Sequence, residues 1–89
     1  MRAIVTVIGH DRTGIIAEIC MVLAEAGVNI LDINQTVMQE FFTMTMLVDT
    51  STSPLSFEEL SKRLADKGED MKMNIRIQRE DIFNAMHKI

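Results

Sequence analysis

Hydrophobic positions along the chain change their spacing several times, and each change marks a new element. Residues 3–8 are nearly all apolar and β-branched, a run too short for a helix and closed by Gly9, so they predict a largely buried strand. From Thr13 to Gly27, apolar residues recur every three or four positions, as in an amphipathic helix. Thr13 is the expected N-cap of this helix, and Gly27 is its expected C-terminal stop.

The next two segments have the two-residue period of strands. Residues 28–37 alternate apolar and polar side chains, with Leu31, Ile33 and Val37 on one side. Residues 41–49 are apolar on both sides and predict a third strand. Because only two residues, 39 and 40, separate these strands, the pair must form an antiparallel hairpin, although its turn lacks the Gly or Asn that such turns prefer.

The C-terminal half contains a second helix and a fourth strand. Ser56 and Glu59 are spaced as a capping box at the start of the helix, which is expected to stop at Gly68. Residues 71–78 alternate again and predict a strand with one wet face. A short amphipathic helix is expected over about 80–88, with acidic residues near its start and basic residues near its end, as the helix dipole favours.

The order βαββαβ predicts an α+β fold of the ferredoxin-like type. In this sandwich a four-stranded antiparallel sheet carries two helices on one face, with the first and third strands in the centre. We expect residues 1–89 to form a single domain. Two helices leave the other face open, so it needs cover over Phe41 and Leu47 and over one of two alternative sets: Ala3, Val5 and Val7, or Ile4 and Ile8. The C-terminal helix and a second copy of the chain would supply this cover, so we expect a homodimer or a higher homo-oligomer.

Charge and cysteine content exclude several functional classes. The net charge of -4, with nine scattered Lys and Arg residues, disfavours nucleic-acid binding. Cys20 is the only cysteine, which rules out an internal disulfide or a Cys-based zinc site, and we expect it to be a small packed hydrophobe. The N-terminal run is too short and too soon interrupted by charge for a signal peptide or a membrane span. No membrane partner is expected, and the cytoplasm is the expected location.

The turn GHDRTG, from Gly9 to Gly14, is the strongest candidate for a ligand site. It lies at the expected N-terminus of the first helix, where unpaired N–H groups and a partial positive charge suit a carboxylate. Gly14 has no side chain to block that approach, and Asp11 could pair with a ligand ammonium. These groups match a zwitterion better than a simple anion. The alternative interpretation is a plain turn in which Asp11 and Arg12 form only a surface ion pair.

Other chemistry at this turn is disfavoured by residue type. The glycine spacing is that of a P-loop, but Ile15 and Ile16 stand where the phosphate-binding Lys and the Mg-binding Ser or Thr must be. His10 and Asp11 lack a third ligand fixed by spacing, so we expect no metal site and no cofactor. No Ser-His-Asp or Cys-His arrangement is suggested, and we do not expect an enzyme.

The segment GHDRTGIIAEICMVLAEAGVNILDI resembles the signature of the ACT domain family, the small-molecule-binding modules of many regulators of amino-acid metabolism. The resemblance covers the whole βαββαβ order and is strongest from Val5 to Ile33. Thr13 departs from the family pattern, in which Pro is common, and His10 inherits no family role. The chain is most similar to small stand-alone ACT proteins and to the glycine-cleavage type of regulator.

The resemblance implies a ligand site where the turn after the first strand meets the start of the second, often across a dimer interface. Carried over by position, the site residues are Asp11, Arg12, Thr13, Gly14 and Ile15 on one side, and Asn29 and Ile30 on the other. The implied function is regulatory and non-catalytic: binding an amino acid or related metabolite and acting on an unidentified protein partner. The alternative is a constitutive dimerisation or protein-interaction module without a ligand. Met21, opposite the main apolar stripe of its helix, could mark a contact with a subunit or partner.

Overall fold

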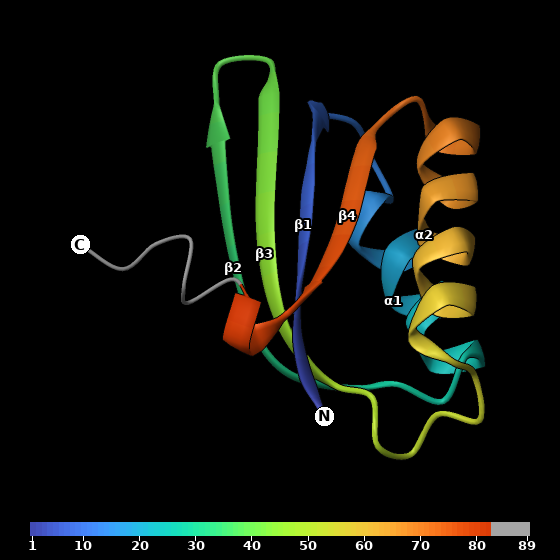
Figure 1. Cartoon of the computed structure of the whole chain (residues 1–89). Helices are drawn as coiled ribbons and strands as arrows, with labels where there is room; N and C mark the ends of the chain where they lie inside the picture. The colour runs from blue at the N-terminus through green and yellow to red at the C-terminus, as the bar shows by residue number, and fades with distance from the viewer. Residues whose placement is uncertain (83–89) are drawn as a thin grey trace.

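The expected order of elements is confirmed. The structure, a computed structural model, describes residues 1–82, in the order β1(Arg2–His10), α1(Ile15–Glu25), β2(Asn29–Met38), β3(Phe41–Asp49), α2(Phe57–Met71) and β4(Asn74–Arg79). Both helices lie on one side of the sheet (Figure 1). Residues 80–82 form a helical turn, and the rest of the helix predicted over 80–88 lies outside the described residues.

The sheet has the strand order β2-β3-β1-β4, with every neighbouring pair antiparallel. β1 and β3 are central, as the ferredoxin-like topology requires. Because β1 and β2 both run antiparallel to β3, they are parallel to each other, and their carboxyl ends lie at the same end of the sheet. His10 and Met38 both pair with Phe41 at that end of the sheet. The turn that follows β1 therefore lies near the carboxyl end of β2.

The core lies between the sheet and the two helices. Of the two alternative sets on β1, the helices cover the one that contains Val5 and Val7, whereas Ile8 on the opposite face is 55% exposed. Burial of each large aliphatic side chain contributes roughly 1.5–3 kcal/mol. Cys20 is partly buried and packs against the core, as a small hydrophobe. The largest fully buried side chains are Ile15, Ile19, Leu23, Met44, Met46, Leu60, Leu64, Val5, Val7 and Val48.

The β2–β3 hairpin forms despite the poor turn sequence. Gln39 takes a φ of 56°, the left-handed conformation that the two-residue turn needs and that Gly or Asn adopts at lower cost. A bulge between Ile30 and Asp32 leaves Leu31 without a partner on β3. The predicted alternation of β2 therefore restarts at Asp32, and Leu31 does not share the register of Ile33.

The second helix starts as predicted but ends later. The Ser56 hydroxyl accepts a hydrogen bond from the Glu59 N–H at 3.1 Å, and the Ser56 N–H donates to the Glu59 carboxylate at 3.3 Å, which is the predicted capping box. The predicted stop at Gly68 is wrong, because the helix continues to Met71 and its C-cap is Lys72. Gly68 is buried inside the helix, where the backbone oxygen of Met73 leaves no room for a Cβ.

β2 is one of the two edge strands of the sheet, and the helices leave most of it exposed. All its residues except Ile30 are exposed, on both faces of the sheet. Even on the side that faces the helix layer, Ile33 is 39% and Val37 is 53% exposed. A long, uncovered edge strand with apolar side chains is unusual in a lone subunit, because its free backbone groups can pair with another chain.

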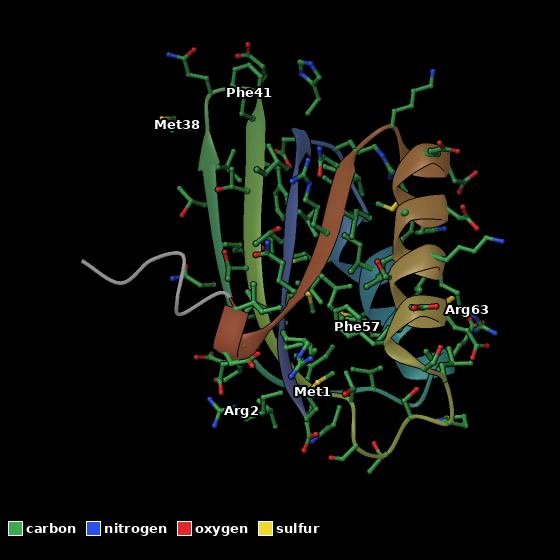
Figure 2. The ribbon with its side chains drawn as sticks, in the orientation of Figure 1. Met1, Arg2, Met38, Phe41, Phe57 and Arg63 are labelled. Carbon is green, nitrogen blue, oxygen red and sulfur yellow. The ribbon has the colours of Figure 1, made fainter. Side chains whose placement is uncertain are left out.

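The open face of the sheet carries further exposed apolar side chains. Met38 and Phe41 lie at the free end of the β2–β3 hairpin (Figure 2), and Phe41 is 48% exposed. Ile4 and Leu47, nearer the other end of the sheet, are half-buried. Of the residues expected to need additional cover, Phe41 and Ile8 are therefore exposed, whereas Ile4 and Leu47 are only half-exposed.

Candidate functional site

The N-terminus of α1 is capped by glycine rather than by Thr13, which corrects the sequence prediction. Gly14 is the N-cap, with a φ of 88°, and no side-chain hydrogen bond from the described residues caps the helix. A left-handed conformation favours Gly and excludes the extended geometry in which a Thr side chain reaches the helix N–H groups. The first turn of α1 therefore presents N–H groups that lack intrahelical partners, next to a residue without a side chain.

The turn before α1 is held at both ends. The backbone N–H of Asp11 donates to the carbonyl of Glu40 at 2.7 Å, which ties the turn to the β2–β3 hairpin. The Arg12 guanidinium contacts the Glu18 carboxylate at 2.7 Å and donates to the carbonyl of Thr13 at 3.0 Å. Arg12 therefore pairs with Glu18 on α1, not with Asp11 as the plain-turn interpretation supposed.

Asp11 keeps a free carboxylate. Its side chain has no hydrogen bond or ion pair within residues 1–82. In contrast, the pKa of Glu18 is lowered, first by the hydrogen bond from Arg12 and then by the charges of Arg12 and Lys67. The turn thus offers one unpaired negative charge, Asp11, close to the positive end of a helix.

A hollow of about 270 Å³ opens between this turn and the end of β2. Its polar lining comes from Asp11, Arg12, Gly14 and Gln35, and the remaining lining residues are Ile15, Ile16, Ala17, Val37 and Phe42. Small-molecule pockets usually measure about 300–1,000 Å³, so this hollow is small enough to be part of a site rather than a whole one.

The structure brings together most of the predicted site residues but not all. Asp11, Arg12, Gly14 and Ile15 line the hollow, and Thr13 belongs to the same turn without lining it. The pair at positions 29 and 30 lies at the opposite end of β2, where Asn29 pairs with Asp49, and Asp49 pairs with Arg2. At about 3.3 Å per residue, Asn29 and Ile30 are on the order of 15–25 Å along the strand from Gln35 and Val37, which line the hollow.

Sequence reasoning missed five lining residues: Ile16 and Ala17 on α1, and Gln35, Val37 and Phe42 on the sheet. One signal was available for Gln35: it is a polar residue at a position of the apolar alternation that also contains Ile33 and Val37. A polar residue at such a position either forms a hydrogen bond within the core or lines a surface or site. The sequence alone could not show that β2 lies near the turn, because this proximity depends on strand order and register.

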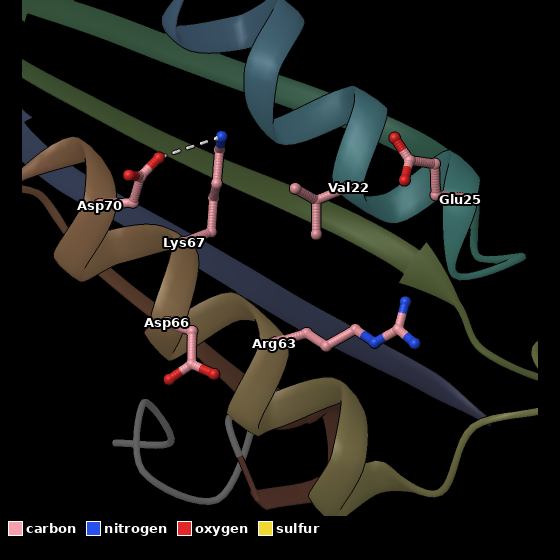
Figure 3. A pocket seen from close by; sticks show the side chains of 6 residues that line it. All are labelled: Val22, Glu25, Arg63, Asp66, Lys67 and Asp70. Carbon is pink, nitrogen blue, oxygen red and sulfur yellow. Dashed lines mark hydrogen bonds and ion pairs between the residues drawn. The ribbon is translucent and has the colours of Figure 1, made fainter.

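A second hollow of about 350 Å³ lies between α1 and α2 (Figure 3). It is lined by Val22, Glu25, Arg63, Asp66, Lys67 and Asp70. Lys67 pairs at 3.5 Å with Asp70 and at 3.5 Å with Glu18, which in turn pairs with Arg12. This chain of surface charges links the two helices, and such exposed pairs typically contribute about 0–1 kcal/mol each.

Two other predicted features lie away from the turn hollow. The ring of His10 packs against Phe41 with centroids 5.4 Å apart, and the strand alternation puts both on the open face of the sheet. Met21 is 61% exposed on α1. Within residues 1–82, no cluster of three or more His, Cys, Asp or Glu side chains is arranged to hold a metal ion. Neither helix of the described chain has the length and apolar character needed to cross a membrane.

Comparison with known proteins gives one consistent family. Residues 2–78 match the family model described as the ACT domain. The chain is 52% identical over 89 residues to a UPF0237 protein of Listeria monocytogenes, with 100% of both chains covered. It is similar in structure to an ACT domain protein from Streptococcus pneumoniae, with a TM-score of 0.82, 41% identity and 93% of each chain covered.

A more distant structure is that of a protein assigned as a glycine cleavage system transcriptional repressor. The TM-score is 0.76 at 26% identity, and the match covers 86% of this chain and 44% of that one. Together with the βαββαβ sandwich, the β2-β3-β1-β4 sheet and the glycine-capped turn before α1, these matches agree at the levels of sequence and fold. The chain therefore belongs to the ACT domain family and is similar to its small UPF0237 members.

Proposed function

We propose that this protein is a non-catalytic sensor that binds an amino acid or a related metabolite at the turn hollow of a homodimer. The observation that carries the proposal is that a partial positive charge and a negative charge line the same hollow. The free N–H groups at the start of α1 suit a carboxylate, and the unpaired Asp11 carboxylate suits an ammonium. Because Arg12 is already engaged by Glu18, a zwitterion fits this arrangement better than an anion.

The small volume of the hollow supports a site completed by a second copy. Antiparallel pairing of β2 with β2 of the second copy, about a two-fold axis near the middle of the strand, would cover the exposed edge. It would also set Asn29 and Ile30 of the second copy beside the end of this β2, next to Val37 and the hollow. The residues that one chain holds far apart would then meet across the interface.

The names of structural relatives support a regulatory role. The protein assigned as a glycine cleavage system transcriptional repressor is 26% identical to this chain. The hollow at the turn and the hollow between the two helices are both open to solvent, so neither would shield reacting groups from water. We therefore infer that a bound metabolite changes the affinity of this protein for a partner protein.

The alternative is a constitutive dimerisation or interaction module without a ligand. The observation that favours it is the extent of exposed apolar surface on β2, where Leu31, Ile33, Val37 and Met38 are all at least 39% exposed. Such a surface is sufficient reason for a dimer even if nothing binds at the turn.

A thermal-shift panel of the twenty amino acids separates these two functions. A ligand at 100 times its dissociation constant stabilises a folded protein by about 2.7 kcal/mol, which for a domain this small is roughly a 10–20 °C rise in Tm. We expect at least one amino acid to give such a rise in the wild type. Asp11→Asn should abolish it, whereas Asp66→Asn, on the exposed side of α2, should not. No shift from any amino acid would favour the constitutive module.

The dimer is tested separately by light scattering at tens of micromolar protein. Ile33→Lys puts a charge on the uncovered edge strand and should give a monomer, whereas Ala65→Lys, on the exposed surface of α2, should leave the dimer intact. A monomeric wild type would contradict the homodimer.

Gly14 variants are a less clean test of the ligand site than Asp11→Asn. A Cβ at Gly14 would have open space, with the nearest atom, a Glu18 carboxylate oxygen, 4.0 Å away. However, the φ of 88° strains any L-residue by roughly 1–2 kcal/mol. Loss of binding in such a variant must therefore be compared with its loss of stability.

A further inference from the structure

Gln35 is a polar residue on an otherwise apolar side of β2. It pairs with Met44, which is buried beneath the helices, so its side chain lies on the helix-facing side of the sheet. Its neighbours on that side of the strand are Ile33 and Val37. A glutamine in this alternation needs a reason, because an apolar side chain would pack better against the same surroundings.

Within residues 1–82, the side chain of Gln35 has no hydrogen-bond partner. The side chain is exposed, and its carboxamide makes no hydrogen bond within the described residues. It therefore contributes no identified polar contact to the stability of the subunit. At the same time Gln35 lines the hollow that contains Asp11 and Gly14. Its free carboxamide can donate and accept hydrogen bonds, and it lies across the hollow from the start of α1.

Among the polar side chains of this chain that line the hollow, Gln35 is the one placed to distinguish between ligand side chains. Arg12 is held by Glu18 and by the carbonyl of Thr13, and Asp11 is the unpaired charge. The side chains around Gln35, those of Val37 and Phe42, are apolar. A ligand that sets its carboxylate at the helix and its ammonium at Asp11 would point its side chain toward β2, where Gln35 is the polar side chain that this chain contributes.

We infer that Gln35 selects the side chain of the ligand and that the preferred ligand is an amino acid with an uncharged, hydrogen-bonding side chain. This inference rests on the proposed function. A charged side chain would find Asp11 occupied by the ligand ammonium and Arg12 held by Glu18, and an aliphatic one would leave the carboxamide unpaired after water is displaced. Because the hollow is open to solvent, we expect discrimination of roughly tenfold rather than the much larger factors of enclosed sites.

Isothermal titration with matched pairs of amino acids tests this selection. Thr against Val and Asn against Leu compare side chains of similar shape with and without hydrogen-bonding groups, and Asn against Asp compares neutral with charged. In the wild type, Thr or Asn should bind about tenfold tighter than its counterparts. Gln35→Leu should remove that preference while retaining binding through the α-amino and α-carboxylate groups. The control Asn34→Leu makes a similar change on the opposite face of the same strand and should leave the preference unchanged.

The outcomes separate this inference from the proposed function. If wild-type protein binds none of these amino acids, the proposed sensor and the role of Gln35 are both wrong. If Gln35→Leu binds with the same order of preference as wild type, or if wild type prefers Val and Leu, only the role of Gln35 is wrong. Loss of preference in Gln35→Leu but not in Asn34→Leu supports it, and circular dichroism checks that both variants are folded.

Discussion

Gly68→Ala is expected to destabilise this protein, although the substitution removes a glycine from a helix interior. In an exposed helix, replacing Gly by Ala gains about 1 kcal/mol from helix propensity. Here a Cβ on Gly68 would lie 2.7 Å from the backbone oxygen of Met73 and 3.4 Å from the backbone nitrogen of Ile75. These are backbone atoms that cannot rotate away, so the connection from α2 to β4 must move as a unit.

The size of the effect follows from two opposing terms. Overpacking typically costs about 1–3 kcal/mol, which exceeds or equals the gain of about 1 kcal/mol from propensity. The shift also affects the hydrogen bond from the Met73 N–H to the carbonyl of Gly68, at 2.8 Å. We therefore expect a net loss of about 1 kcal/mol in the free energy of unfolding, and at most about 2 kcal/mol. This corresponds to a fall in Tm of roughly 4–8 °C for each kcal/mol.

Urea unfolding at one fixed protein concentration measures this change, because association would make stability depend on concentration. The matched control is Asp66→Ala, an exposed position of the same helix, which should gain about 0.5 kcal/mol from propensity without any clash. If Gly68→Ala proves as stable as wild type or more stable, the close approach of α2 and β4 does not constrain position 68, and the steric reasoning is refuted.

Three further predictions concern helix ends and one surface charge. Lys72→Gly should stabilise the fold by about 1 kcal/mol in urea unfolding, because Lys72 has a φ of 59° that Gly adopts without strain; unchanged stability would contradict this. Ser56→Ala removes the capping box and should cost about 1 kcal/mol in the same assay, whereas Ser56→Asp should retain most of the stability. Arg12→Ala should raise the pKa of Glu18 in an NMR titration, because the hydrogen bond from Arg12 is the main cause of its lowering. A carboxyl group with a lowered pKa stabilises the fold at pH values above its unfolded pKa, and this contribution is lost as the pH falls through its folded pKa. The free energy of unfolding of Arg12→Ala should therefore fall less on acidification than that of the wild type.

Local patterns predicted the elements because each depends on neighbours in the chain. The capping box at Ser56 and Glu59 joins residues three apart, so it could be recognised before any tertiary contact was known. The N-cap at Thr13 was predicted by the same reasoning and was wrong, because the preceding turn brings Gly14 into a left-handed conformation. Gly68 was mistaken for a helix stop, since a buried glycine and a terminating glycine are identical in sequence. Only the approach of β4 distinguishes them.

Some residues of the candidate site could likewise be predicted from the sequence, and others could not. Asp11, Arg12, Gly14 and Ile15 are close in sequence and line one hollow, as their spacing and the family resemblance indicated. Gln35 and its neighbours on β2 join that hollow only through the strand order. The sequence grouped Asn29 and Ile30 with the turn, whereas the register puts them at the other end of the strand, so a shared site requires a second chain.

What the sequence by itself determined is the order of elements, the two alternative apolar faces of the first strand and the charged turn before the first helix. These follow from the periods of hydrophobic residues and from caps, which act over a few residues. Tertiary structure alone decided that most of β2 is exposed, that Arg12 forms an ion pair with Glu18, and that Gln35 lines the hollow beside the turn. It also decided that the Asp11 carboxylate has no partner among residues 1–82. Those facts depend on strand order and on register, in which a shift of a single residue moves every side chain to the opposite face of the sheet.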